Sequence, residues 1–100
     1  MAEAELSDIQ HEEHGHRGSF FMTRGDKRVA RLTYSRGNEQ LVIIDHTEVD
    51  PSLEGRGIAR GLLDAAVAWA RETGTKFMVT CPYASSQFAK DQSIGDVLLA

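Results

Sequence analysis

The stretch HTEVDPSLEGRGIARGLL, residues 46–63, joins a strand-like hydrophobic segment to a helix-like one through a turn that holds Gly55 and Gly57. A helix that begins at such a turn has unpaired backbone N–H donors and a partial positive charge at its first residues. Two interpretations are open on this pattern alone. The turn is a structural helix start, or its amides form a cradle for a phosphate group.

The segment after the turn has the hydrophobic period of an amphipathic helix. Its apolar residues fall on one side: Ile58, Leu62, Ala65, Ala66 and Trp69. Its charged residues fall on the opposite side: Arg60, Asp64 and Arg71. Gly74 follows as the expected C′ residue. The next segments, KFMVTC at 76–81 and YASSQFAKD at 83–91, predict a strand ending at Cys81 and a short helix.

Three segments before the turn have strand patterns: 18–24, 28–36 and 39–49. GDK at 25–27 and RGN at 36–38 are hairpin signals between them. The polar segment DIQHEEHGHR, residues 8–17, is a frayed lead-in or a short edge strand. The order β-β-β-α-β-α predicts an α+β fold, with a mostly antiparallel sheet of about four to five strands, a crossover helix and a short C-terminal helix.

Length, charge and composition limit the classes of protein to which this chain can belong. Its 100 residues fit one domain, expected at 9–100 after a flexible N-terminus at 1–8. A net charge of −4 argues against a general nucleic-acid surface, and the longest aliphatic run, residues 41–44, is far too short for a membrane span. The start has no apolar signal segment, and the single cysteine suits a reducing compartment. We expect a cytoplasmic protein, a monomer or weak homodimer, with no nucleic-acid or membrane partner.

Several ligand motifs are excluded by their spacing. The glycine turn is not a Walker A loop, because no Gly-Lys-Ser/Thr follows it. It is not a dinucleotide fingerprint, because Arg60 occupies the third glycine position and hairpins precede it in place of a βαβ unit. HEEHGH, residues 11–16, has Gly15 where a zinc-protease helix needs histidine, so no metal site is predicted.

The residues VDPSLEGRGIARGLL, 49–63, resemble the acyl-CoA pyrophosphate loop of the GNAT N-acetyltransferase superfamily, whose signature is Gln/Arg-x-x-Gly-x-Gly/Ala. Gly57 and Ala59 match its last two positions. HTEVDPS and CPYASSQF resemble the minimal, single-domain branch of these enzymes, and the resemblance runs from about Ile9 to Leu98. Glu54 departs from the signature, which prefers glutamine or arginine there.

The resemblance implies a GNAT fold that binds acetyl-CoA and transfers its acetyl group to a primary amine of unknown identity. No metal is implied. The CoA-binding residues it implies are Val49, Gly55, Arg56, Gly57, Ile58, Ala59 and Arg60. It also implies His46 and Cys81 as catalytic residues. His46 is the candidate base, with Glu48 as an alternative, and Cys81 is an acid, a transient acetyl carrier or a wall of the thioester pocket.

A second departure concerns the proton that the leaving thiolate takes up. Many GNAT enzymes carry a tyrosine for this step in the last helix, and alignment of SQFAKD with that helix places Phe88 there. Tyr83 and Cys81 are the nearby alternatives. We expect direct attack of the amine in a ternary complex, because orienting two bound substrates already removes much of the barrier. The alternative is a CoA-binding or interaction module with little transferase activity.

Overall fold

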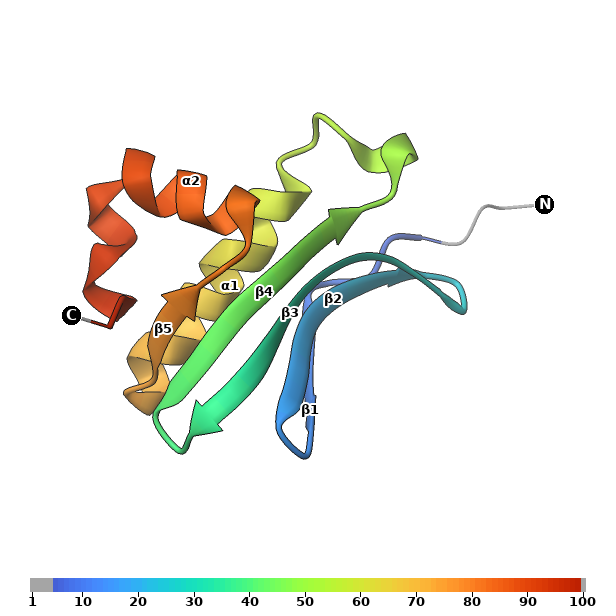
Figure 1. Cartoon of the computed structure of the whole chain (residues 1–100). Helices are drawn as coiled ribbons and strands as arrows, with labels where there is room; N and C mark the ends of the chain where they lie inside the picture. The colour runs from blue at the N-terminus through green and yellow to red at the C-terminus, as the bar shows by residue number, and fades with distance from the viewer. Residues whose placement is uncertain (1–4, 100) are drawn as a thin grey trace.

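Five strands form one sheet whose order in space follows their order in the chain (Figure 1). The computed structural model describes residues 5–99. Its strands are β1 (Gln10–His14), β2 (Arg17–Arg24), β3 (Lys27–Asn38), β4 (Leu41–Val49) and β5 (Lys76–Val79). Tight turns join the first four strands, which therefore run antiparallel to their neighbours, whereas β5 pairs in parallel with β4.

The helical elements follow β4: η1 (Pro51–Leu53), α1 (Ile58–Thr73), α2 (Pro82–Lys90) and η2 (Gln92–Val97). α1 is the crossover that makes the parallel pairing of β5 with β4 possible. Gly57 and Gly74 flank this helix with left-handed φ angles of 72° and 73°, which explains why glycine occupies both ends. The predicted α+β fold, with its crossover helix and short C-terminal helix, is confirmed.

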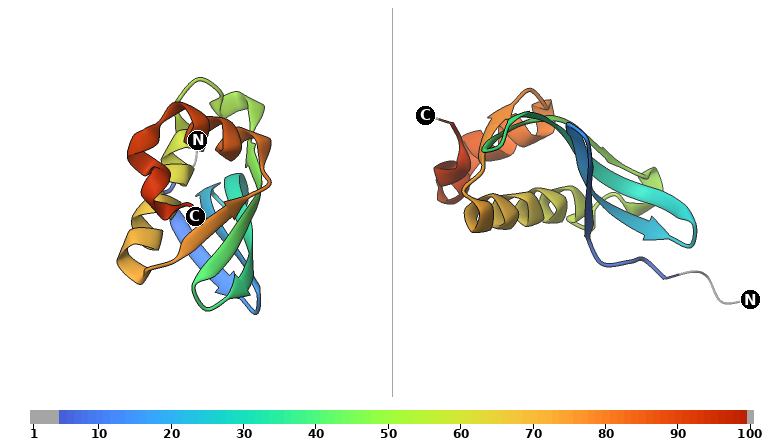
Figure 2. Two further views of the ribbon diagram at one scale, coloured as in Figure 1. Left: turned by 60° about the vertical axis from the view of Figure 1, so that its left-hand side comes forward. Right: turned by 90° about the horizontal axis from the view of Figure 1, so that it is seen from below.

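The hydrophobic core lies between the helices and one face of the sheet. Figure 2 shows α1 lying along this face, while Figure 1 views the opposite face of β2 to β4, which we call the outer face. Side chains with no exposed surface come from both layers: Leu32, Val42, Ile44, Leu62, Leu63 and Ala84. The outer face carries polar and charged side chains, among them Arg17, Arg31, Asp45, His46 and Glu48.

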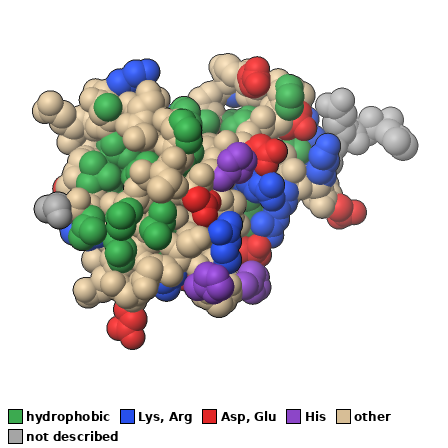
Figure 3. All heavy atoms as spheres, viewed as in Figure 1, with side chains coloured by type: hydrophobic (Ala, Val, Ile, Leu, Met, Phe, Trp, Pro, Cys, Tyr) green, Lys and Arg blue, Asp and Glu red, His purple; other side chains and the backbone are tan. Residues whose placement is uncertain are grey.

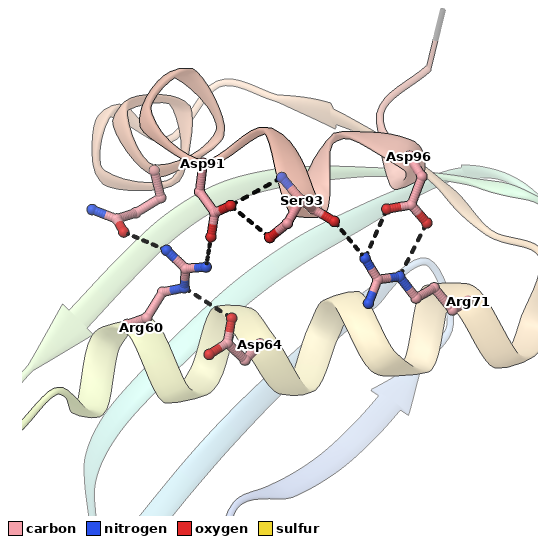
Figure 4. Close-up of polar contacts among 7 residues, drawn as sticks. Arg60, Asp64, Arg71, Asp91, Ser93 and Asp96 are labelled. Carbon is pink, nitrogen blue, oxygen red and sulfur yellow. Dashed lines mark hydrogen bonds and ion pairs between the residues drawn. The ribbon is translucent and has the colours of Figure 1, made fainter.

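Two arginines of α1 connect it to the C-terminal elements (Figure 4). Arg60 donates to Gln87 at 2.9 Å and to Asp91, the residue that follows α2. Arg71 forms a two-pronged ion pair with Asp96 of η2, with both N···O distances between 2.8 and 3.0 Å. The Arg60 contacts hold α2 beside the start of α1, and the Arg71 contacts hold η2 beside the end of α1.

The N-terminal segment adds to the edge of the sheet. β1 is the short edge strand that the polar segment 8–17 allowed. Of the expected flexible segment 1–8, residues 1–4 lie outside the described residues, whereas Leu6 bridges Arg24 and the Ser7 amide donates to the Thr23 carbonyl at 2.8 Å. Within residues 5–99, none of the helices combines the length and the apolar character that crossing a membrane requires.

Candidate functional site

β4 and β5 separate halfway along β4. Their parallel ladder ends where Ile44 lies opposite Val79, and the Ile44 carbonyl still accepts from the amides of Thr80 and Cys81 at 2.9 and 3.1 Å. β5 ends at Val79, two residues before its predicted end at Cys81, and the chain then turns into α2 at Pro82. β4 continues alone on this side to Val49, so its last residues have backbone groups that β5 does not pair.

A groove of about 180 Å³ opens between this free end of β4 and the start of α1. Six of the seven residues expected to bind CoA line it: Val49, Gly55, Gly57, Ile58, Ala59 and Arg60. Arg56, the seventh, lies in the same turn outside the lining. Leu53, Glu54 and Tyr83 complete the walls, which are mainly apolar. The fold therefore gathers these residues around one cavity, and we call it the loop groove.

The start of α1 leaves its amides free of side-chain caps. Gly57 occupies the N-cap position without a side-chain hydrogen bond, and no acidic residue lies in the first turn. The first intrahelical bond runs from the Gly61 amide to the Gly57 carbonyl at 3.0 Å, so the amides before Gly61 have no partner inside the helix. Gly55 and Gly57 have φ angles of 82° and 72°, and a Cβ at either position would meet no heavy atom within 4 Å. The backbone conformation, rather than crowding by the protein, requires glycine at both positions.

Arg60 has a different surrounding from the one expected for a cation beside a phosphate. Its guanidinium bonds Asp64 at 2.8 Å and also Asp91, which raises the pKa of Arg60 above its ordinary value. Hydrogen bonds from Ser93 and Arg60 lower the pKa of Asp91 to about 2. The positive charge of Arg60 is thus matched by two carboxylates, and its side chain fixes α2 while its amide belongs to the helix start.

Cys81 lies at the N-cap position of α2, buried to 2% exposure, where it is part of the core. Its Sγ lies 3.3 Å from Oγ1 of Thr47, the one hydrogen-bond partner of this thiol among residues 5–99. Thr47 belongs to the free end of β4, so Cys81 faces the opening between β4 and α2. A hydroxyl is no base strong enough to take a thiol proton, so this contact leaves the thiol without an activating partner.

His46 points away from Cys81 because β4 contains a bulge. Tyr34 pairs with Ile44 and Thr33 pairs with His46, which leaves Asp45 as the extra residue. Beyond the bulge, Thr47 takes the core-facing position and His46 the outer one. His46 is 59% exposed, and its Nε2 lies 3.8 Å from Oε2 of Glu48 on the same face. The structure therefore brings Thr47, in place of His46, to Cys81.

Tyr83 and Phe88, both in α2, lie in different surroundings. Tyr83 lines the loop groove from the first turn of α2, and burial raises the pKa of its hydroxyl. Phe88 lies in the core, where its ring meets that of Phe77 edge-on with the centroids 6.5 Å apart. The phenolic proton closest to the groove is therefore that of Tyr83, and Phe88 has a packing role.

The architecture is that of known acetyltransferases. The NMR structure of a GCN5-like protein from Staphylococcus aureus has a TM-score of 0.68 and 29% sequence identity, covering 94% of this chain and 91% of that one. An aminoglycoside acetyltransferase from an uncultured soil metagenomic sample has a TM-score of 0.58 and 22% identity, covering 77% and 57%. The second likeness shows the fold alone. Together with the loop groove, these similarities define the class as an α+β acetyltransferase fold.

The sequence itself gives the family. The model of the GCN5-related N-acetyl-transferase family matches residues 19–97. Protein NATD1 of Bos taurus is 34% identical over 88 residues, which cover 86% of this chain and 77% of that protein. The chain therefore belongs to the GCN5-related N-acetyltransferase family, and the predicted family is confirmed.

Proposed function

We propose that this protein binds acetyl-CoA in the loop groove and transfers the acetyl group directly to a primary amine. The observation that carries this proposal is the meeting, at Val49, of an uncapped helix start and the edge of β4 that β5 leaves unpaired. The free amides and the dipole of α1 suit the pyrophosphate. The apolar walls of the groove suit the pantetheine chain. An unpaired backbone amide near Val49 suits the thioester carbonyl oxygen, on which negative charge develops.

The reaction makes few demands on the side chains. The amine nitrogen bonds to the acetyl carbonyl carbon, and the carbon–sulfur bond of the thioester breaks. The nitrogen loses one proton, and the departing sulfur gains one. We propose that His46 accepts the proton from the nitrogen, directly or through water, with Glu48 as the alternative base. We propose that the sulfur takes up its proton from Tyr83, because this hydroxyl lines the loop groove and a phenol is protonated near neutral pH.

Cys81 forms a wall of the thioester site in this proposal. Its thiol is buried and touches the hydroxyl of Thr47, and His46 lies on the other face of β4. A cysteine that carried the acetyl group would need a base beside it to form the thiolate. Direct attack needs no such base, because the amine approaches from the side on which His46 and Glu48 lie.

A thermal melt with acetyl-CoA tests the binding part of the proposal. At one hundred times the dissociation constant, linkage predicts stabilisation by about 2.7 kcal/mol. Gly57→Val should remove this stabilisation, because a branched side chain would cover the free amides of the helix start. Gly74→Val is the matched control, since Gly74 has almost the same backbone angles (φ 73°, ψ 17°) as Gly57 (φ 72°, ψ 17°) and lies at the other end of the helix. Both variants carry the same strain, and only the control should keep the acetyl-CoA shift.

A turnover assay separates the enzyme from a binding module. Free CoA should appear only when an amine is added, and His46→Ala should slow this by about a hundredfold near neutral pH, with a smaller loss at high pH where more amine is neutral. Stabilisation by acetyl-CoA without turnover on any amine would favour the CoA-binding module. Absence of stabilisation at millimolar acetyl-CoA would contradict both.

A further inference from the structure

A second groove, of about 330 Å³, lies on the other side of β4. It is formed by the start of β3, the end of β4 and the two residues that follow β4, and its lining includes Val49, which also lines the loop groove. We call it the outer groove. The two grooves thus adjoin the same residue of β4, at the place where the proposed function positions the thioester.

Charged residues of both signs line the outer groove. Lys27, Arg28 and Arg31 line it together with two carboxylates, Glu48 and Asp50, and Glu12 of β1 pairs with Arg28 from outside the lining. Figure 3 shows basic, acidic and histidine side chains gathered on this face, over β3 and β4, while hydrophobic side chains gather toward α2. Three cations within one groove can attract an anion where their carboxylate partners are exposed and exchangeable.

The side chains of the outer groove divide into anchored and exchangeable groups. The Arg28 guanidinium lies 3.8 Å from the centroid of the Phe21 ring and bonds Glu12, so it is held in place. Asp50 uses Oδ1 to accept from the amide and hydroxyl of Ser52, at 2.9 and 2.8 Å, which commits it to capping η1.

Lys27 and Arg31 are the cations that a ligand can reach. The Lys27 ammonium is 76% exposed and lies 3.9 Å from Asp50, and Arg31 is 49% exposed and pairs with Glu48 at 2.9 Å. Exposed ion pairs of this kind contribute little stability, so a ligand anion can replace them at small cost.

The strand register places these groups relative to the thioester site. Ala30 lies opposite Val49, and Arg31 lies opposite Glu48. Lys27 and Arg31 lie on either side of Ala30 along β3, so their long side chains flank a molecule that presents its nitrogen at Val49. Its nitrogen then lies on the same face as Glu48 and His46, the candidate bases.

From this arrangement, and on the basis of the proposed acetyl transfer, we infer that the acceptor is a small primary amine that carries an anionic group. The anion is a carboxylate or a phosphate, and it contacts Lys27 and Arg31 in the outer groove. The amine reaches Val49 beside Glu48. The volume of the groove suits a small molecule.

Matched acceptors test this inference. 4-Aminobutyrate is compared with 4-aminobutanamide, its neutral isostere, and O-phosphoethanolamine with ethanolamine, so the two pairs distinguish a carboxylate from a phosphate. In at least one pair the anionic member should have a kcat/KM about tenfold or more above its neutral partner. In the variant with both Lys27→Gln and Arg31→Gln this ratio should fall to near one. Arg17→Gln is the control, because Arg17 pairs with Asp45 on the same face without lining the groove, and it should keep the ratio.

The outcomes separate this inference from the proposed function. Equal kcat/KM values within both pairs, with turnover intact, overturn the inference and leave the transferase standing. If no amine is acetylated, the proposed function fails. NMR shift mapping with 4-aminobutyrate and O-phosphoethanolamine then tests whether the outer groove binds an anion. Shifts at the amides of Ala30, Arg31 and Glu48 that vanish in the double variant support an anion site there, and their absence overturns it.

Discussion

Gly18→Ala tests how tightly the Tyr34 ring packs against β2. Gly18 lies directly opposite Tyr34 in the β2–β3 ladder, and the tyrosine ring covers it. A Cβ on residue 18 would lie 2.2 Å from Cζ of Tyr34 and 2.4 Å from its hydroxyl oxygen, far inside van der Waals contact. Tyr34 is 1% exposed and its ring stacks on Trp69 with the centroids 5.5 Å apart, so it has no free space to move into.

The expected loss follows from two contributions. Overpacking of a tight core costs about 1 to 3 kcal/mol. Displacement of the ring also breaks the 2.7 Å hydrogen bond between the Tyr34 hydroxyl and His11, worth about 1 kcal/mol. A total near 3 kcal/mol corresponds to a fall in Tm of roughly 12 to 24 °C for a domain of this size.

Thermal unfolding followed by circular dichroism measures this loss. Gly95→Ala is the control, because a Cβ there meets no atom within 4 Å and its φ is not left-handed, so its Tm should stay within a few degrees of the parent. Adding Tyr34→Leu to Gly18→Ala should cost less than the sum of the two single changes, since leucine lacks the clashing atoms. A Gly18→Ala protein that melts within about 4 °C of the parent, a shift worth no more than about 1 kcal/mol, would refute the packing argument.

Three further results are expected. Cys81→Ala should keep acetyl transfer within about tenfold of the parent, and mass spectrometry should find no acetylated protein that forms as fast as turnover; a fast acetyl-Cys81 species would contradict direct attack. Burial lowers the pKa of His11 below 6.5, so as the pH drops the unfolded chain protonates His11 before the folded chain does. The free energy of unfolding should therefore fall as the pH drops through 6.5, and chemical denaturation of His11→Gln should show a weaker fall. Gly61→Ala should stabilise the protein by about 1 kcal/mol and so raise its Tm, because alanine favours the helix and its Cβ would lie at an ordinary 3.6 Å from Ile9. An unchanged or lower Tm would show that the helix requires glycine there.

The fold was largely predictable because its determinants are local in the sequence. The hairpin signals at 25–27 and 36–38, the helical period from Ile58 and the glycine at 74 each specify a turn, a helix or an end. The edge strand β1 was harder, since its sequence QHEEH is polar. Its residues are ordered by partners distant in the chain: Glu13 pairs with Arg36, and the His11 ring stacks on Phe20.

The site was predictable only in part. The loop residues from Gly55 to Arg60 are contiguous, so a helix start that gathers their amides follows from sequence alone. The bulge at Asp45 does not. It is stabilised by hydrogen bonds that Asp45 accepts from Thr33 and Ser35 of the neighbouring strand, and no pattern within the sequence of β4 predicts these bonds. That one extra residue decides whether position 46 or 47 faces the core.

The same bulge bears on the chemistry. It places Thr47 beside Cys81 in the core-facing layer and His46 beside Glu48 on the outer face, so the thiol and the candidate base lie on opposite sides of β4. An enzyme that passed the acetyl group through Cys81 would need the base on the thiol side. With the candidate base on the side of the proposed amine site and both grooves adjoining Val49, the proposed direct transfer requires only that two bound substrates meet at the end of β4. A chain of 100 residues has room for that alignment, and the alignment itself supplies most of what direct transfer needs.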